Sequence, residues 1–150
     1  MRVMFGATSV LAAALCVAAA ANAEQTITRA HVPRAVLAAF AKQWPNAKVR
    51  GYSREVEKGE TTYEVESREG DVKRDVSFAA DGSVSVVEET MPASALPAGA
   101  QSVLAGLKPA AKVGAVEKVT RGATVEYEVH VRQGAKAKEI VFDLEGKRTK

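Results

Sequence analysis

The chain has 150 residues, which is enough for one domain of common size or for two very small domains. Its 21 lysines and arginines are interspersed with 18 acidic residues, and the formal net charge of +3 is too small to favour nucleic acid as a partner. With 47% hydrophobic residues, the composition also excludes a chain that is disordered throughout.

The first 23 residues have the pattern of a secretory signal peptide. Arg2 supplies a short positive region, and the run from Val3 to Ala20 contains no charge. Ala21-Asn22-Ala23 then fits the small-x-small cleavage pattern. The alternative is a transmembrane anchor, but the run is near the lower length limit for a span. We therefore predict cleavage after Ala23, export to the periplasm and no stable membrane insertion afterwards.

The only cysteine, Cys16, lies inside this apolar run. It follows Leu15, where lipoprotein processing needs a small residue, so we do not expect a lipid anchor. Cleavage would remove Cys16 together with Arg2, which leaves a cysteine-free protein with a net charge of 3 − 1 = +2. Disulfides would then contribute nothing, and the mature protein must fold on its hydrophobic core alone.

The rest of the chain repeats itself at a shift of 109 − 45 = 64 residues, without a gap from residue 32 to residue 150. The matched positions are residues whose chance alignment is rare: Pro33 with Pro97, Pro45 with Pro109, Tyr63 with Tyr127, Gly70 with Gly134, Phe78 with Phe142, and Gly82 with Gly146. We infer an internal duplication.

In the first copy, a helix is predicted between Pro33 and Pro45, because Val36, Leu37 and Phe40 recur at helical spacing. Alternating patterns then predict strands over 48–56, 61–67, 73–80 and 83–88, with hairpin turns at 68–71 and 81–82. The second copy predicts a helix that Gly106 weakens, strands over 113–119, 124–132 and 136–144, and a short basic strand over 147–150.

These elements predict an α+β fold of two tandem repeats, each with one helix packed on a four-stranded antiparallel β-meander. The predicted bounds are a signal peptide at 1–23, a first repeat at 24–90, a linker at 91–96 and a second repeat at 97–150. We expect Tyr63 and Tyr127 to pack under the helices, and Trp44 to close the first helix against the sheet.

Four motifs of the first copy carry a resemblance to a known family. They are Val-Pro-x-x-Val-x-x-x-Phe from Val32, Trp-Pro-Asn-Ala-Lys-Val from Trp44, Tyr-Glu-Val from Tyr63 and Phe-x-x-Asp-Gly from Phe78. Together they resemble the PepSY-like proteins, exported domains that are grouped with the β-lactamase-inhibitor-like fold. The resemblance covers residues 32 to 150 and implies tandem copies of a helix-plus-sheet unit. The second copy departs from it, with Lys108 in place of the aromatic residue before proline. Such a resemblance implies a fold, and fold alone does not carry function.

No constellation of chemically active residues is apparent in the sequence. His31 and His130 do not occupy shared positions of the two repeats, and no serine stands in a nucleophile elbow. Glu88-Glu89 could be a pair of acid–base carboxylates, but a solvated strand end is the favoured interpretation. We therefore predict no enzyme activity, no catalytic residue, no cofactor and no metal site.

The remaining candidate is the surface of the sheet. We predict a non-enzymatic, periplasmic protein-interaction or inhibitor-like module that binds a periplasmic protein through its sheet faces. The predicted partner-binding face includes Arg50, Arg54, Glu64 and Glu66. The alternative is an envelope protein that binds a small ligand, a metal or a peptide in a cleft between the repeats.

Overall fold

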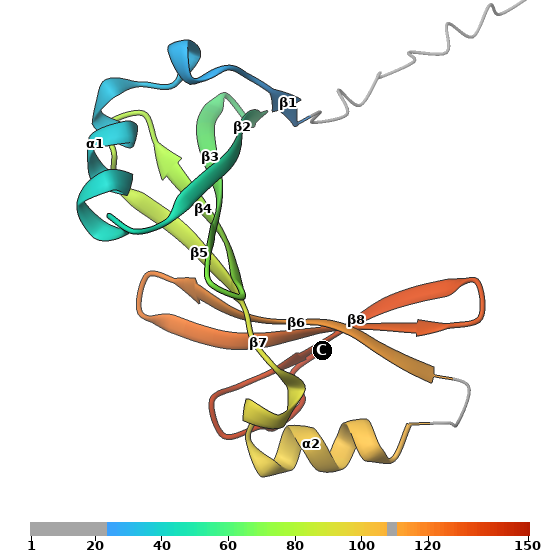
Figure 1. The fold of residues 1–150 in the computed structure, drawn as a ribbon. Helices are drawn as coiled ribbons and strands as arrows, with labels where there is room; N and C mark the ends of the chain where they lie inside the picture. Colours follow the sequence, from blue (N-terminus) through green and yellow to red (C-terminus); the bar gives the residue numbers. More distant parts are fainter. Residues whose placement is uncertain (1–23, 108–110) are drawn as a thin grey trace, which may run out of the picture.

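The computed structural model describes residues 24–107 and 111–150, so the predictions for 1–23 and for Pro109 lie outside the described residues. Eight strands form one antiparallel sheet in the order β1-β2-β3-β4-β5-β6-β7-β8 (Figure 1). The strands are β1 (Gln25–Thr26), β2 (Lys48–Glu57), β3 (Glu60–Glu69), β4 (Val72–Ala79), β5 (Val84–Thr90), β6 (Ala111–Arg121), β7 (Thr124–Gln133) and β8 (Lys136–Phe142). The helices are η1 (Arg29–His31), α1 (Arg34–Gln43), η2 (Ala93–Ala95) and α2 (Ala98–Ala105), of which the two η elements are single 3₁₀ turns.

The predicted fold class is wrong. The protein is mostly β, and its strands form one continuous sheet rather than two separate units of a helix on a four-stranded meander. The two halves join because β5 pairs with β6, from Val86 opposite Arg121 to Thr90 opposite Glu117. An unpaired β5 edge would have exposed a row of backbone donors and acceptors, and this pairing satisfies them.

The two halves also differ in their number of strands. β1, which the sequence did not predict, adds to the edge of β2. The predicted strand over 147–150 forms an isolated bridge between Phe142 and Arg148 and a few backbone hydrogen bonds to residues 141 and 143, but no regular strand. The segment 147–150 carries Lys147, Arg148 and Lys150, whereas β5 carries three valines. Without alternating apolar residues the segment has no face to bury, so it does not extend into a strand.

The 64-residue shift is nevertheless preserved in the positions of the elements. Helix α1 starts at Arg34 and α2 at Ala98, and each follows a proline with an extended backbone, Pro33 or Pro97. Tyr63 is opposite Phe78 in the first half, and Tyr127 is opposite Phe142 in the second. Both halves therefore use the same local plan and the same cross-strand pairing.

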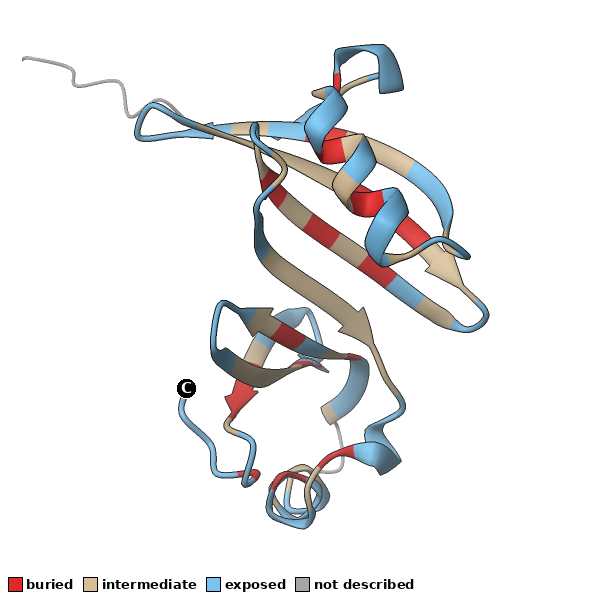
Figure 2. Cartoon of the chain, turned by 90° about the vertical axis from the view of Figure 1, so that its left-hand side faces the viewer, coloured by how far each residue is buried: buried red, intermediate tan, exposed pale blue. Residues whose placement is uncertain are grey.

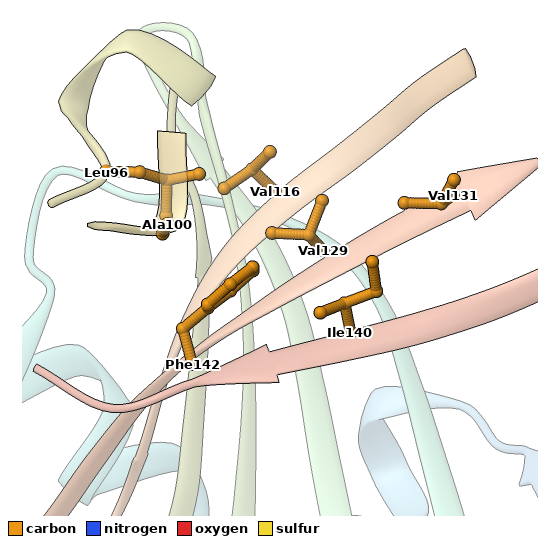
Figure 3. Packing of buried hydrophobic residues seen from close by; sticks show 7 residues of the cluster. All are labelled: Leu96, Ala100, Val116, Val129, Val131, Ile140 and Phe142. Carbon is orange, nitrogen blue, oxygen red and sulfur yellow. The ribbon is translucent and has the colours of Figure 1, made fainter. Parts of the chain in front are cut away.

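Each helix covers its own hydrophobic cluster. Under α1 the buried residues are Val32, Val36, Phe40, Val65, Val76 and Phe78. Under α2 they are Leu96, Ala100, Val116, Val129, Val131, Ile140 and Phe142 (Figure 3). Buried positions alternate with less buried ones along the strands below α1, as expected for strands with one buried face (Figure 2). Phe78 and Phe142 are both 0% exposed, which confirms that the duplicated phenylalanine is a core residue in each half.

Trp44 packs at the end of α1, as the sequence predicted. Its ring centroid lies 5.3 Å from that of Phe40, and the guanidinium carbon of Arg74 lies 5.5 Å from the Trp44 ring. Arg74 is buried on the helix side of the sheet and pairs with Glu69 and Glu89 at 3.2 and 2.8 Å. A buried charge needs such partners, so this cluster is a structural feature of the first half.

No helix among the described residues is both long and apolar enough to cross a membrane.

We expect Phe78→Ala to lower the free energy of unfolding by about 3–5 kcal/mol, because the change leaves a cavity beneath α1. Urea unfolding of the mature protein measures this. Val84, which is 36% exposed, provides the control: Val84→Ala should cost less than about 1 kcal/mol. A loss below about 1 kcal/mol for Phe78→Ala would contradict its place in the core.

The hairpin turn after β4 touches the backbone of α1, and only glycine fits there. Gly82 has a φ of +88°, and a Cβ at this position would lie 2.7 Å from the Ala35 carbonyl oxygen. Gly70 has a φ of +58° but open space around it. Gly70→Ala should therefore cost about 1 kcal/mol from backbone strain alone. Gly82→Ala should cost roughly 2–4 kcal/mol, because the helix must also move. Equal losses in thermal or urea unfolding would show that the contact with the helix is unimportant.

Candidate functional site

Both helices lie on the same face of the sheet, and the opposite face is here called the helix-free face. Directly opposed residues of neighbouring strands point to the same side. Val65, Val76 and Val87 form one such row, and the first two are buried under α1. The residues that alternate with this row, such as Glu66, Asp75 and Glu88, therefore belong to the helix-free face.

The centre of the helix-free face carries a row of directly opposed carboxylates, here called the acidic ladder: Glu66 on β3, Asp75 on β4 and Glu88 on β5. Glu66 is opposite Asp75, and Asp75 is opposite Glu88. Like charges in directly opposed positions destabilise a sheet. Among residues 24–107 and 111–150, no ion pair to Lys, Arg or His includes any of the three.

Glu64 stands next to the acidic ladder, two residues before Glu66 on β3. It is half-buried, and its cross-strand neighbours are Ser53 and Ser77 rather than cations. Carboxylate oxygens of Glu24, Glu64 and Glu66 lie within 4.8 Å of one another. Such groups are common on acidic surfaces, and we assign no ion to this one.

Burial and mutual repulsion change the acidity of these carboxyls. Burial, followed by the negative charges of Glu24, Asp75, Glu66 and Glu88, raises the pKa of Glu64 to about 7. Burial also raises the pKa of Asp75, with Glu66 and Glu117 adding to the effect while Lys73 opposes it. The pKa of Glu88 is raised by burial and then by Glu117 and Glu128, against the opposing charge of Arg121.

The second half shows the same positions with compensated charges. At the 64-residue shift, His130 replaces Glu66 and stands opposite Glu139. The Nε2 atom of His130 lies 3.2 Å from a Glu117 carboxylate oxygen. Arg121 pairs with Glu126 and Glu128 at 3.5 and 3.1 Å. The fold therefore does not require three opposed carboxylates at these positions.

Two valines also lie on the helix-free face. Val119 is opposite Glu88 and Glu126, and Val141 is opposite Glu128. They are 1% and 6% exposed although they belong to neither core cluster. Among the described residues, both α-helices lie on the other side of the sheet, so neither helix covers these valines. Two buried apolar side chains thus lie among the carboxylates of the helix-free face, Val119 on β6 and Val141 on β8.

The predicted binding residues do not all lie on one face. Glu64 and Glu66 lie on the helix-free face, and Arg50 lines a hollow of about 430 Å³ together with Glu66 and Asp75. Arg54 is opposite Tyr63 on the helix side, where its guanidinium donates a 2.8 Å hydrogen bond to the Gln25 side chain. As a set, these four residues remain an untested prediction.

Sequence reasoning missed Asp75 and Glu88 as neighbours of Glu66. The sequence suggests Glu88 and Glu89 as a carboxylate pair because the two are adjacent. Consecutive strand residues face opposite sides, however, and Glu89 accepts a hydrogen bond from Arg74 on the helix side. The only available signal was that Glu66, Asp75 and Glu88 fall on alternating positions of three consecutive predicted strands.

Comparison with protein families identifies the fold. The family model described as "Putative beta-lactamase-inhibitor-like, PepSY-like" matches twice, over residues 20–84 and 61–150. The chain belongs to the PepSY-like family. The two matches overlap and together reach across the whole described sheet, in agreement with the internal duplication. A search of curated proteins finds no match.

Several solved structures share this PepSY-like fold. A protein from Bacteroides eggerthii described as "putative periplasmic" is 17% identical, with a TM-score of 0.68 over 80% of this chain and 87% of its own. A DUF2874 family protein from Bacteroides uniformis is 17% identical, with a TM-score of 0.66 over 79% and 87%. A BLIP-like protein from Bacteroides fragilis is 21% identical, with a TM-score of 0.62 over 79% and 84%. At these identities the likeness shows the fold alone.

Replacing Glu64 tests the acidity of this PepSY-like face. The pKa of Glu64 is about 7 in the folded protein and 4.5 ordinarily. Between pH 4.5 and pH 7 the folded state therefore binds more protons than the unfolded state, and the free energy of unfolding falls as pH rises through this range. Glu64→Gln should therefore raise the free energy of unfolding by about 1 kcal/mol at about pH 8, after allowing for solvent screening, and by almost nothing near pH 4.5. Urea unfolding at both pH values measures the difference. The exposed Glu60→Gln is the control, and an equal effect of the two changes would contradict the assignment.

Proposed function

We propose that this PepSY-like protein is a non-enzymatic, periplasmic interaction or inhibitor-like module whose helix-free face binds a basic surface of a partner protein. The observation that carries the proposal is the acidic ladder, three directly opposed carboxylates without an ion-pair partner among the described residues. A basic partner would supply ion-pair partners for these three carboxylates.

The acidic ladder lowers the stability of the sheet, and the fold does not require it. Opposed like charges destabilise a sheet, and His130 shows that the same position accepts a compensating residue in the second half. Natural sequences depart from local rules of stability mostly where function requires it. An uncompensated acidic row on an otherwise regular sheet therefore supports a binding role.

The chemistry of the face favours a basic protein surface over other partners. Lysine and arginine side chains placed between Glu66, Asp75 and Glu88 would relieve their repulsion and form charge-assisted hydrogen bonds. Complementary charge also steers encounter and rejects acidic partners. Val119 and Val141, which are opposite carboxylates on neighbouring strands, would supply apolar contact to a partner that displaces the side chains around them.

The proposed location rests on two observations. Residues 1–23 have the signal-peptide pattern with a cleavage site after Ala23, and the structure from Bacteroides eggerthii is described as "putative periplasmic". The family description as inhibitor-like, rather than as an enzyme, supports a non-enzymatic role.

The alternative site, a cleft between the repeats, has less support. The repeats meet through continuous backbone pairing of β5 and β6. Five surface hollows in the described part of the chain are each lined by residues of one repeat alone. A ligand seated between repeats would need a hollow lined by both.

The proposal is tested by protein capture with two charge-matched triple variants. One variant combines Glu66→Gln, Asp75→Asn and Glu88→Gln, and the other combines Glu57→Gln, Glu60→Gln and Glu145→Gln at exposed positions away from the ladder. Immobilised mature proteins are incubated with periplasmic extract, and bound proteins are identified by mass spectrometry. We expect the wild type and the exposed-site variant to retain the same basic protein, and the ladder variant to lose at least about tenfold of it.

Two outcomes would contradict the proposal. One is a partner that the ladder variant retains as well as the wild type does. The other is a wild type that retains no basic protein above the level of a blank resin. Circular dichroism and thermal unfolding check the fold of each variant, and the ladder variant should be at least as stable as the wild type because it removes repulsion.

A further inference from the structure

We propose that the outer edge of β8, from Lys136 to Ile140, accepts an extended segment of a partner protein as one more strand of the sheet. This segment would carry an apolar residue opposite Ile140 and, two residues later, an acidic residue opposite Lys138. The edge is here called the docking edge. It lies on a different strand from the acidic ladder, so the inference goes beyond the proposed function.

The evidence begins with the strand that covers the same edge in the first repeat. There β5 pairs with the outer edge of β4, and β8 is the counterpart of β4 at the 64-residue shift. The bridge between Phe142 and Arg148 is likewise the counterpart of the pair Phe78–Val84. The segment 147–150 therefore follows β8 in the register that β5 has on β4.

A local irregularity of this pairing is repeated as well. The register between β4 and β5 shifts next to Ser77, where the Ser85 hydroxyl donates a 3.0 Å hydrogen bond to the Ser77 carbonyl oxygen. In the second repeat the Thr149 hydroxyl donates a 3.3 Å hydrogen bond to the Val141 carbonyl oxygen. Residues 148–150 thus correspond to the first three residues of β5.

Past the position of Lys150, the outer edge of β8 has no partner strand among the described residues. The Val141 N–H donates a 3.3 Å hydrogen bond to the Lys150 carbonyl oxygen, so the backbone groups of Val141 point outward. Outward-pointing groups recur at every second residue of an antiparallel strand, so those of Glu139 and Ala137 point outward too. Their N–H and C=O groups are available to a further strand.

The contacts of β5 show which residues such a strand should carry. On the helix side, Val87 is opposite the buried Val76. Two residues later, Glu89 is opposite Arg74 and accepts a 2.8 Å hydrogen bond from its guanidinium. β5 therefore combines an apolar residue and an acidic residue on the side of the sheet that α1 covers.

On β8 the same two places hold an apolar residue and a cation, Ile140 and Lys138. Glu69, the other acid that pairs with Arg74 in the first repeat, corresponds to Gln133 in the second. Lys138 is exposed and makes no ion pair within the part of the chain that the structure describes. An acidic residue of an added strand would supply the missing partner.

A hollow of about 450 Å³ lies beside the docking edge, and its lining includes Ala137, Glu139 and Arg132. Ala137 and Gly114, which also lines it, are small and leave room for a side chain of an added strand. The Lys150 ammonium lies 3.4 Å from a Glu139 carboxylate oxygen. We therefore expect a basic residue opposite Glu139, on the other side of the sheet from the acidic one.

A second copy of β8 is a poorer occupant of this edge. Two-fold antiparallel pairing places one residue opposite itself. A centre at Lys138 or at Glu139 opposes two like charges directly, and a centre at Ala137 opposes Lys136 with Lys138. Directly opposed like charges destabilise a sheet. The charges of the docking edge therefore favour a segment of different sequence.

The experiment first supplies the strand within the chain. The mature protein is extended after Lys150 by Val-Lys-Glu-Thr-Glu, which places the valine opposite Ile140. The lysine then comes opposite Glu139, and the first glutamate opposite Lys138. A composition-matched extension, Val-Glu-Lys-Thr-Glu, opposes like charges at both positions and is the control. Attachment gives both segments a high effective concentration.

Amide hydrogen exchange, measured by NMR, reports the added pairing residue by residue. We expect the first extension to slow the exchange of the Ala137 and Glu139 amides by at least about tenfold relative to the unextended protein. The control extension should slow it by less than about threefold. The N–H groups of Lys138 and Ile140 already point toward β7, so their exchange should change by less than about threefold in either variant.

The same strand is then supplied as a separate molecule. A free peptide Val-Lys-Glu-Thr-Glu with blocked ends is titrated onto the unextended protein at millimolar concentration. It should shift the Ala137 and Glu139 amide signals, and it should bind at least about tenfold more tightly than the free control peptide. The protein with the first extension should not respond, because its docking edge is already paired.

Four outcomes would overturn the proposal. They are unchanged exchange of Ala137 and Glu139 in both extended proteins, equal protection by the two extensions, and a free peptide that leaves these amides unaffected. The fourth is protection in the unextended protein that rises with its own concentration, which would assign the docking edge to a second copy. The capture experiment on the acidic ladder is independent of all four.

Discussion

The pairing of β5 with β6 is the interaction on which the rest of this structure depends. It joins two copies of one sequence plan into a single sheet, through five directly opposed residue pairs from Val86–Arg121 to Thr90–Glu117. It also keeps the two helices on one side, because sheet register decides which side each residue faces. The opposite side is therefore one uninterrupted surface, shared by both halves.

This shared surface explains why carboxylates from both copies influence one another. Glu117 of β6 raises the pKa of Glu88 on the adjacent strand β5 and of Asp75 one strand further, on β4, because β5–β6 pairing brings the two halves together. The two copies have diverged on this surface while keeping equivalent cores. One copy concentrates uncompensated carboxylates, and the other pairs its carboxylates with Arg121 and His130. Duplication has thus preserved the packing side and changed the solvent side.

The cores themselves are small and similar. Val36, Val65, Val76 and Phe78 in the first cluster correspond at the 64-residue shift to Ala100, Val129, Ile140 and Phe142 in the second. Each half alone would be marginal, since a unit of this size buries a smaller share of its surface on folding than a larger domain does. The close contact of each hairpin turn with its helix adds to the packing, and glycine permits it: a Cβ on Gly146 would lie 2.8 Å from the Ala100 nitrogen, as one on Gly82 would meet Ala35.

The sequence by itself determined the duplication, the two main helices, seven of the eight strands to within a few residues, and the burial of Phe78 and Phe142. These features depend on local periodicity and on residues that a turn or a core requires. Only the tertiary structure decided that the repeats share one sheet, that β1 joins its edge, and that 147–150 does not form a strand. It alone aligned Glu66, Asp75 and Glu88, and it separated Arg54 from Glu64 and Glu66. The physical reason is that strand register is a long-range property: it is set when distant strands pair, and a shift of one residue would send every side chain to the other face.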